Sequence, residues 1–239
     1  MTTPHRHWKV LPHGKLTAVD DGILTVVGEL RMPLMRLSRR MTVARLHDSR
    51  LVIWSAIALD DTEMATLDAY GRPAFLVVPN AHHRLDAKAW KVRYPQMLVV
   101  APPGARAKVA KVVSVDTTTP DFGDTDVEFM SVPGTGDREA ALVVRTPNGA
   151  TLVLNDLVGN IRRTSGIEGR LLGLTGFGGR TPRIPRVAKL ALVEDADALR
   201  RQLLQWAEIA SLQRILVSHG EPIETNARQT LRDLAGSLA

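Results

Sequence analysis

The sequence contains no cysteine, which excludes a disulfide framework and zinc sites built from thiolates. Any metal ion would have to be bound by histidine, aspartate, glutamate or asparagine side chains. The absence of cysteine also fits a reducing compartment. Aromatic residues are scarce as well, at 4% of the chain. This scarcity argues against binding of single-stranded nucleic acid, because proteins that do so stack the bases on aromatic side chains.

Long apolar runs are also missing. Residues 1–15 contain no continuous apolar segment of the kind found in secretory signal peptides. No later run approaches the roughly 20 apolar residues that a membrane-spanning helix needs. We therefore expect a cytoplasmic protein that does not associate with membranes.

The chain does have the composition of a globular protein. Of its 239 residues, 44% are hydrophobic and 23% are charged, which is enough to bury a core. We expect a single domain over residues 1–239, because this length suits one large core. The 31 basic and 25 acidic residues give a net charge of +6, which favours a small anionic molecule as partner. The basic residues cluster only at 180–186, which argues against nucleic acid.

The first half of the chain alternates predicted strands with predicted helices. Residues 41–46 and 51–57 form a predicted hairpin, and residues 23–30 form a strand before it. A helix should run from Asp60 or Asp61 to residue 70, with Met64, Ala65 and Leu67 on its buried face. The remaining elements are a strand at 74–78, a helix at 85–94, a strand at 97–101 and a helix at 105–113.

The second half begins with three predicted strands, at residues 126–132, 140–145 and 151–154, which should form an antiparallel meander. Residues 160–186 are rich in glycine and arginine and show little periodicity. They are followed by a helix at 196–212 with Ala210 on its buried face, a strand at 214–217 and a helix at 227–238. The whole pattern predicts a mixed α/β fold of two mixed sheets flanked by helices.

Polar residues follow the end of a predicted strand in three places: at 79–86, at 154–157 and at 217–220. Binding groups gather at strand ends in open α/β sheets, since the strands are rigid and the loops beyond them can converge. We therefore expect these three segments to form one pocket.

The order of a strand with a histidine-rich loop, a later strand with aspartate, and a last strand with His-Gly resembles the metallo-β-lactamase superfold. The segments RRMTVARL, LVIWSAIAL, AFLVVPNAHHRLDAKAW and TLVLNDLVGN are similar to a poorly characterised branch of that fold whose members lack the full metal motif. The resemblance covers most of the chain. It implies a four-layer αββα sandwich.

The resemblance also implies a degenerate metal-binding motif. The superfold carries His-x-His-x-Asp-His in its first loop, and this sequence has Asn80, Ala81, His82, His83, Arg84 and Leu85 in those positions. Of these, only His82 matches. Further along, Asp156 matches the bridging aspartate and His219 the last histidine, whereas the Pro-Gly turn at 133–136 is followed by no histidine. The matched metal ligands are His82, Asp156 and His219; the unmatched neighbour His83 is a further candidate ligand, and Asp86 lies beside them.

Arg84 leaves alternatives open, because a guanidinium cannot bind a cation. In the first, Arg84 pairs with Asp156 in place of a metal, and the protein is a non-catalytic or weakly catalytic binder of a small anionic ligand. In the second, one zinc or iron ion supports hydrolysis of an ester, lactone or phosphodiester, Arg84 clamps the substrate and Asp86 is a reserve general base. The third is nucleic-acid processing.

Two further sets of residues have structural interpretations. His5, His7 and His13 are expected to lie in a solvated, mobile tail rather than in a metal site. Trp54, Trp90 and Trp206 lie in apolar patterns, which places them in the core rather than in a ligand-binding platform.

Overall fold

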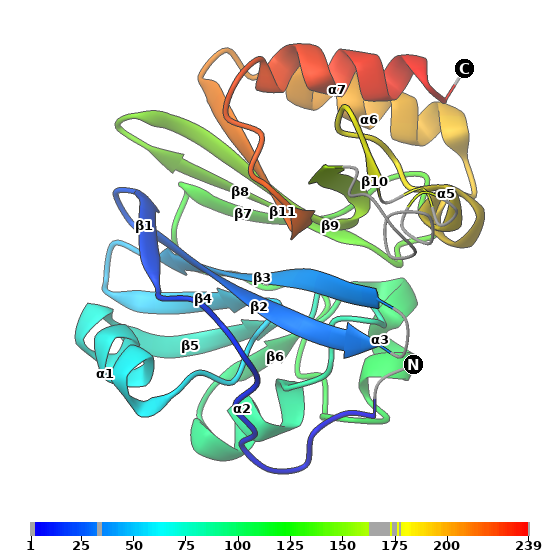
Figure 1. Cartoon of the computed structure of the whole chain (residues 1–239). Helices are drawn as coiled ribbons and strands as arrows, with labels where there is room; N and C mark the ends of the chain where they lie inside the picture. Colours follow the sequence, from blue (N-terminus) through cyan, green and yellow to red (C-terminus); the bar gives the residue numbers. More distant parts are fainter. Residues whose placement is uncertain (1–2, 33–34, 163–172, 174–175, 177, 239) are drawn as a thin grey trace.

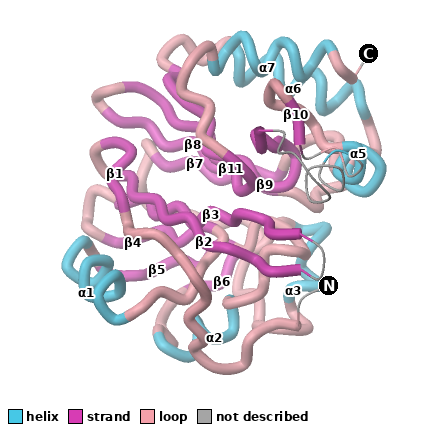
Figure 2. Tube along the Cα trace, viewed as in Figure 1, coloured by secondary structure: helices cyan, strands magenta, loops and turns pink. Residues whose placement is uncertain are grey.

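The computed structural model describes residues 3–32, 35–162, 173, 176 and 178–238. Its elements stack in four layers, with two β-sheets packed face to face and helices covering the outer face of each (Figure 1). The helices at 61–109 lie under the first sheet, and those at 196–236 lie over the second (Figure 2). This arrangement confirms the αββα sandwich that the sequence predicts.

The first sheet is formed by the N-terminal half of the chain in the order β1-β2-β3-β4-β5-β6. Its strands are β1 (Thr17–Asp20), β2 (Ile23–Met32), β3 (Met35–Arg45), β4 (Arg50–Trp54), β5 (Arg72–Val77) and β6 (Leu98–Val100). The pairs from β1 to β4 are antiparallel, and the pairs from β4 to β6 are parallel. The hairpin predicted at 41–57 is confirmed, since Thr42 pairs with Trp54.

The second sheet has the order β10-β9-β8-β7, with β11 also paired to β9. Its strands are β7 (Val127–Ser131), β8 (Ala140–Thr146), β9 (Gly149–Arg162), β10 (Gly178–Gly179) and β11 (Leu212–Gly220). The predicted meander is confirmed, because β7 to β9 are antiparallel neighbours. The last strand, β11, is parallel to β9.

The helical segments are α1 (Asp61–Tyr70), α2 (Ala87–Arg93), η1 (Pro103–Ala105), α3 (Arg106–Val109), α5 (Arg186–Leu192), α6 (Ala196–Ala207) and α7 (Ala227–Gly236). Asp60 caps α1 as predicted, since its side chain accepts a hydrogen bond from the Glu63 N–H. In the same way, Asp195 caps α6 through the Ala198 N–H. Within the described residues, no helix has the length and apolar character that crossing a membrane requires.

The core forms in three layers because the buried strands present apolar side chains on both faces. On β4, Leu51 and Ile53 pack toward α1 and α2, while Val52 and Trp54 pack between the two sheets. A third cluster fills the space between the second sheet and the helices α6 and α7. The three predicted core tryptophans, Trp54, Trp90 and Trp206, are all at most 3% exposed.

Several predicted boundaries were wrong. Helix α6 ends at Ala207 instead of residue 212, so Ala210 is exposed, and Ala65 of α1 is exposed as well. The helix expected at 105–113 is only a short 3-10 segment followed by one α-turn. Helix α5 was not predicted, and much of the glycine- and arginine-rich segment at 160–186 lies outside the described residues.

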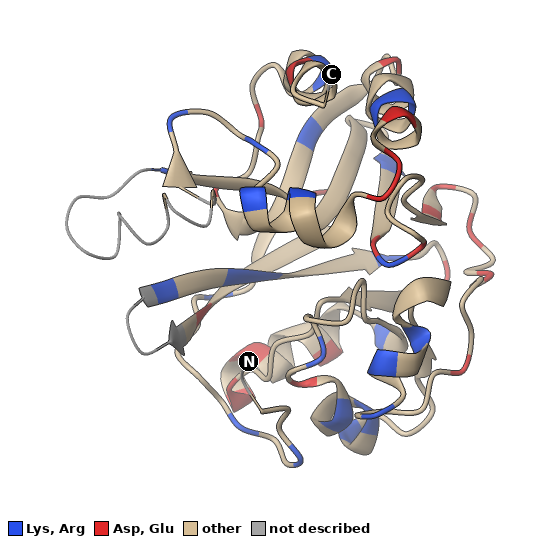
Figure 3. Ribbon diagram, turned by 90° about the vertical axis from the view of Figure 1, so that its right-hand side faces the viewer, with Lys and Arg blue, Asp and Glu red and all other residues tan. Residues whose placement is uncertain are grey.

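The N-terminal histidines also differ from expectation. The Nδ1 atom of His5 lies 2.7 Å from Oδ1 of the buried Asp86, and the His13 Nε2 accepts a hydrogen bond from the Asp60 N–H. These contacts hold the N-terminal segment against the first sheet, where Trp8 also packs on Trp90. Charged side chains are otherwise spread over both halves of the sandwich (Figure 3).

Arg40 joins the two sheets at the edge that carries His219. From β3, its Nε donates to the Val217 carbonyl at 3.1 Å and its Nη2 to the Gly220 carbonyl at 3.0 Å. Its Nη1 also donates to Thr25 Oγ1 at 3.2 Å. Burial lowers the pKa of Arg40, while Glu221 and Glu224 act to raise it. The side chain therefore connects β3 to β11 just where β11 reaches the site.

We expect the substitution Arg40→Met to lower the free energy of unfolding by about 2–4 kcal/mol, because it removes three hydrogen bonds and leaves buried carbonyls unpaired. Urea denaturation measures the change. The matched control is Arg201→Met on the exposed face of α6, which should stay within about 0.5 kcal/mol of the wild type. Equal stabilities of the two variants would contradict the role given to Arg40.

Candidate metal centre

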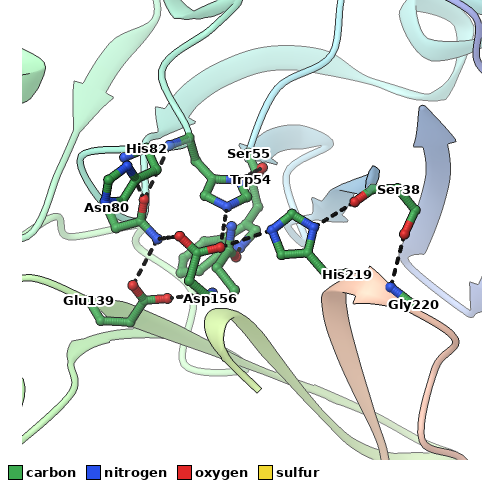
Figure 4. A network of polar contacts seen from close by, with 11 residues as sticks. Ser38, Trp54, Ser55, Asn80, His82, Glu139, Asp156, His219 and Gly220 are labelled. Atoms are coloured by element: carbon green, nitrogen blue, oxygen red, sulfur yellow. Dashed lines mark hydrogen bonds and ion pairs between the residues drawn. The ribbon is translucent and has the colours of Figure 1, made fainter. Parts of the chain in front are cut away.

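Three side chains from distant parts of the chain converge at one end of the sandwich. Asp156 Oδ1 lies 2.9 Å from His83 Nε2 and 3.0 Å from His219 Nε2. One ligand atom from each residue lies within 4.8 Å of the other two. The side chains are largely buried, with 8% of His83, 13% of Asp156 and 5% of His219 exposed. Figure 4 shows Asp156 with His219 on one side and with Asn80 and Glu139 on the other.

Asp156 reaches the site from a bulge inside β9. The pairing of β9 with β11 is regular from Thr151 and Arg214 to Leu154 and Val217 and resumes at Gly159 and His219, so four residues of β9 face the single Ser218. A bulge of this kind turns side chains out of the regular alternation. The strand predicted at 151–154 is therefore longer than expected, since β9 continues through the site to Arg162.

The two histidine rings are held by hydrogen bonds at their far nitrogen atoms. His219 Nδ1 lies 2.5 Å from the Ser38 carbonyl, and His83 Nδ1 lies 2.7 Å from Ser55 Oγ. Ser55 has a φ of 55°, a left-handed conformation that side-chain-bearing residues adopt rarely and often at functional sites. Such partners fix which nitrogen of the ring is presented to the site.

The partner of His219 Nδ1 restricts the protonation of the ring. A carbonyl oxygen can only accept, so Nδ1 carries a proton. In a neutral ring, Nε2 then directs a lone pair at the oxygen of Asp156. Nε2 is therefore the ring nitrogen that faces Asp156 Oδ1 and is available to a cation at this site.

Asn80 ties the histidine loop to the carboxylate. Its Oδ1 accepts from the backbone N–H groups of His82 at 2.7 Å and His83 at 3.1 Å. Its Nδ2 donates to Asp156 Oδ2 at 3.0 Å and to Glu139 Oε2 at 2.8 Å. Glu139 is fully buried, and its Oε1 accepts from the Asp156 N–H at 3.0 Å. Asn80 and Glu139 therefore hold the Asp156 side chain and backbone in place.

The electrostatics favour an ionised Asp156. Burial acts to raise the pKa of Asp156, but the charge of His83 and the hydrogen bonds from His219 and His83 hold it well below the ordinary value. Burial lowers the pKa of His83 against the opposing effect of Asp156. Burial also raises the pKa of Glu139 well above its usual value, and the charge of Asp156 raises it further. The centre therefore places an anionic carboxylate beside two imidazole nitrogens, a set of donor atoms that suits a divalent cation.

The three side chains line a cavity of about 390 Å³. Apart from these ligands, Ser55 and the cationic residues Arg39 and Arg84, most of its wall is apolar. The apolar residues include Leu30, Leu37, Ala56, Leu85, Val187 and Leu192. A cavity of this size suits a small organic molecule with a large apolar part.

Similarity to solved structures decides the fold. The metallo-β-lactamase FIM-1 from Pseudomonas aeruginosa, in its mono-zinc form, aligns over 96% of this chain and 97% of its own, with a TM-score of 0.61 and 13% identity. The DIM-1 metallo-β-lactamase aligns over 97% of this chain and 100% of its own, with a TM-score of 0.63 and 13% identity. A metallo-β-lactamase from Hirschia baltica aligns over 92% of this chain and 97% of its own, with a TM-score of 0.59 and 11% identity.

The chain has the metallo-β-lactamase fold. Neither a protein-family model nor a curated protein sequence matches it. At identities this low, the structural likeness establishes the fold and no more.

Within this metallo-β-lactamase fold, the histidine loop differs from the expected ligand set. The resemblance assigned His82 as the ligand and left His83 as its neighbour. The structure places His83 beside Asp156 and His219, whereas His82 is exposed at the cavity wall. The reason is the Asn80 side chain. Its Oδ1 accepts hydrogen bonds from the backbone N–H groups of both histidines, and these bonds fix the conformation of the loop.

The other two predicted site residues are not in this group. Arg84 donates to the Lys108 carbonyl, and among the described residues no hydrogen bond or ion pair joins it to Asp156, so the expected pairing of the two is absent there. Asp86 is fully buried between His5 and Arg39, 2.7 Å from each, and is unsuited to the role of reserve general base.

Sequence reasoning missed the residues that support the centre. Ser38 lies in the arginine-rich first part of β3, Ser55 lies in the apolar run at 51–57, and Glu139 directly precedes the strand predicted at 140–145. The one available signal was charge or polarity next to buried apolar runs, as at Glu139 before 140–145. Gly220 was noted only as part of the His-Gly pattern; at its φ of 102°, a Cβ would lie 2.1 Å from the Asn160 carbonyl.

A second group of possible ligands lies on the surface. His47, Asp124 and Asp126 also have ligand atoms within 4.8 Å of one another. However, the His47 side chain is 77% exposed. In addition, the Asp124 carboxylate already accepts hydrogen bonds from the backbone N–H groups of His47 and Asp126. These bonds are those of an ordinary polar turn.

Proposed function

We propose that the chain is a metal-dependent hydrolase whose centre holds a single zinc or iron ion. The observation that carries the proposal is the convergence of His83 Nε2, Asp156 Oδ1 and His219 Nε2, with both rings oriented from their far sides. Two histidines and one carboxylate are a frequent ligand set for one divalent ion with open positions. The chemistry of these donors fits zinc or iron.

When bound, such an ion supplies Lewis acidity toward a carbonyl or phosphoryl oxygen and acidifies water. The protein's own residues contribute orientation and exclusion of solvent. Ser38 and Ser55 hold the rings, Asn80 and Glu139 hold Asp156, and the apolar cavity wall excludes bulk water from the substrate. Esters, lactones and phosphodiesters are the substrate classes that this chemistry serves.

One ion is favoured over two because the second oxygen of Asp156 is already used. Asn80 Nδ2 donates to Asp156 Oδ2, which a bridging carboxylate would need for a second ion. In addition, Arg84 stands where the superfold motif has a carboxylate, and a guanidinium cannot act as a ligand. The hydrogen bond from Asn80 and the presence of Arg84 both argue against a centre with two metal ions.

A metal-free binder of a small anionic molecule is the second candidate. It is favoured by the distances of 2.9 and 3.0 Å from Asp156 Oδ1 to the two rings, which also suit direct hydrogen bonds from protonated imidazoles. Such a network would balance the charge of Asp156 without an ion.

Elemental analysis of protein purified without chelators tests the proposal. We expect about one zinc or iron ion per chain, falling below about a tenth in His219→Ala because one of three ligands is lost. A screen of esters, lactones and phosphodiesters should show activity that decreases at least about 100-fold in the same variant. Protein without metal that binds small anions would support the second candidate, and activity unchanged in His219→Ala would overturn the first.

A further inference from the structure

Arg39 is a buried cation at the wall of the cavity. It follows Ser38, whose carbonyl orients His219, and its side chain is only 7% exposed. Its Nη1 lies 2.7 Å from Asp86 Oδ2, while Asp86 Oδ1 is taken by His5. Asp86 thus divides its two oxygens between two partners: Oδ1 is within hydrogen-bond distance of His5, while Oδ2 forms an ion pair with Arg39 Nη1 but no hydrogen bond among the described residues.

The other side of the guanidinium has no partner. Arg39 Nε and Nη2 are buried, and among the described residues neither makes a hydrogen bond. These two nitrogens share one edge of the planar group, and their parallel N–H bonds match the two oxygens of a carboxylate. Buried N–H groups without hydrogen-bond partners are rare in proteins. The unpaired Nε and Nη2 of Arg39 therefore indicate a binding site for a ligand.

The surroundings define the rest of that ligand. Arg39 lines the same cavity as His83, Asp156 and His219, and the wall near it includes Leu30 and Leu37. On the neighbouring strand, Gly28 pairs with Arg39, and a Cβ at Gly28 would lie 3.6 Å from Arg39 Nε. The same Cβ would lie 3.2 Å from Ile57 Cδ1, so the glycine keeps this strand from crowding Arg39 and Ile57.

We propose that the cavity binds a small apolar molecule with a carboxylate, and that the Nε–Nη2 edge of Arg39 anchors this carboxylate. The apolar body of the molecule packs against the leucine-lined wall. Under the proposed function, on which this part rests, the anchored carboxylate sets the distance at which the hydrolysable group meets the centre at His83, Asp156 and His219. Arg39 is then a determinant of specificity and does not touch the reacting atoms.

Calorimetric titration with octanoate and with octanamide tests the anchor in the wild-type protein. The two probes share the alkyl chain and differ in the charge that Arg39 recognises. With a chelator present, we expect octanoate to bind at least about tenfold more tightly than octanamide, as one charge-assisted pair of hydrogen bonds provides. Equal affinities, or no saturable binding of either probe at millimolar concentrations, would overturn the proposal.

Two variants assign the preference to a residue. Arg39→Lys keeps a cation beside Asp86 but lacks the paired edge, so the preference for octanoate should drop below about threefold. Arg84→Gln, at the other cation of the cavity, should retain it. If Arg39→Lys kept the preference for octanoate, or if only Arg84→Gln lost it, Arg39 would not be the residue that anchors the carboxylate.

The variant His219→Ala separates this inference from the proposed function. Binding of octanoate in the presence of a chelator should persist in His219→Ala if Arg39 is the anchor, even if the protein proves to hold no metal. A preference for octanoate that requires added zinc and vanishes in His219→Ala would place the carboxylate on the metal instead. That result would support the metal centre and overturn the role of Arg39.

Discussion

Replacing Asp156 with asparagine should lower the affinity for Zn²⁺ at least about 100-fold. Loss of an outer hydrogen-bond partner alone weakens metal sites by about 10- to 100-fold, and this change removes the charged ligand itself. The amide keeps the shape of the side chain and can still accept from Asn80 Nδ2. Isothermal titration of metal-free protein with Zn²⁺ measures the affinity of each form.

Stability gives a second measure of the same change. At free zinc a thousandfold above the dissociation constant, binding adds about 4 kcal/mol to the free energy of unfolding of the wild type, and Asp156→Asn should lose this increment. The control is Asp126→Asn in the exposed surface group, whose side chain is 45% exposed and which should bind zinc as the wild type does. Zinc affinity lost in Asp126→Asn and kept in Asp156→Asn would move the metal site to the surface turn.

Replacing Glu139 with alanine should lower the free energy of unfolding by about 3–5 kcal/mol. Glu139 is fully buried and accepts from Asn80 Nδ2 and from the backbone N–H groups of Asp156 and Leu157. Alanine leaves these buried donors without partners and creates a cavity, and both effects destabilise. Urea denaturation, followed by tryptophan fluorescence, measures the loss.

Two further variants qualify this result. Glu139→Gln retains one carbonyl oxygen for the backbone donors, so it should lose less than half as much stability as Glu139→Ala. Glu128→Ala on the surface, where the side chain is 53% exposed, should change stability by no more than about 0.5 kcal/mol. If Glu139→Ala were as stable as Glu128→Ala, the buried network would have no structural role.

Much of the fold was predictable from local patterns. The apolar run at 51–57 and the alternating run at 41–46 indicated β4 and β3, and the candidate capping residue Asp60 marked the start of α1. These signals are local, because strand periodicity and helix caps involve residues close in the chain. The ends of elements were less predictable, since tertiary contacts decide where a strand or helix stops, as at Ala207.

The site was predictable only at the level of segments. Residues 79–86, 154–157 and 217–220 do contribute to one cavity, as strand-end reasoning indicated. The choice between His82 and His83 depended on the Asn80 side chain, which bonds to both backbone N–H groups. No spacing rule within the loop encodes that choice, because the other partners of Asn80 are Glu139 and Asp156, more than fifty residues away.

The sequence by itself determined most of the order of strands and helices and the absence of thiolate ligands, because these follow from residue type and local periodicity. Asp156 and His219 were indicated by the resemblance to the superfold. Only the tertiary structure decided that His83 and not His82 faces Asp156, that Asp86 is enclosed by Arg39 and His5, and that Arg84 turns to the Lys108 carbonyl. The physical reason is that a side chain's direction is set by the hydrogen bonds available after folding, and those partners come from strands far apart in the chain.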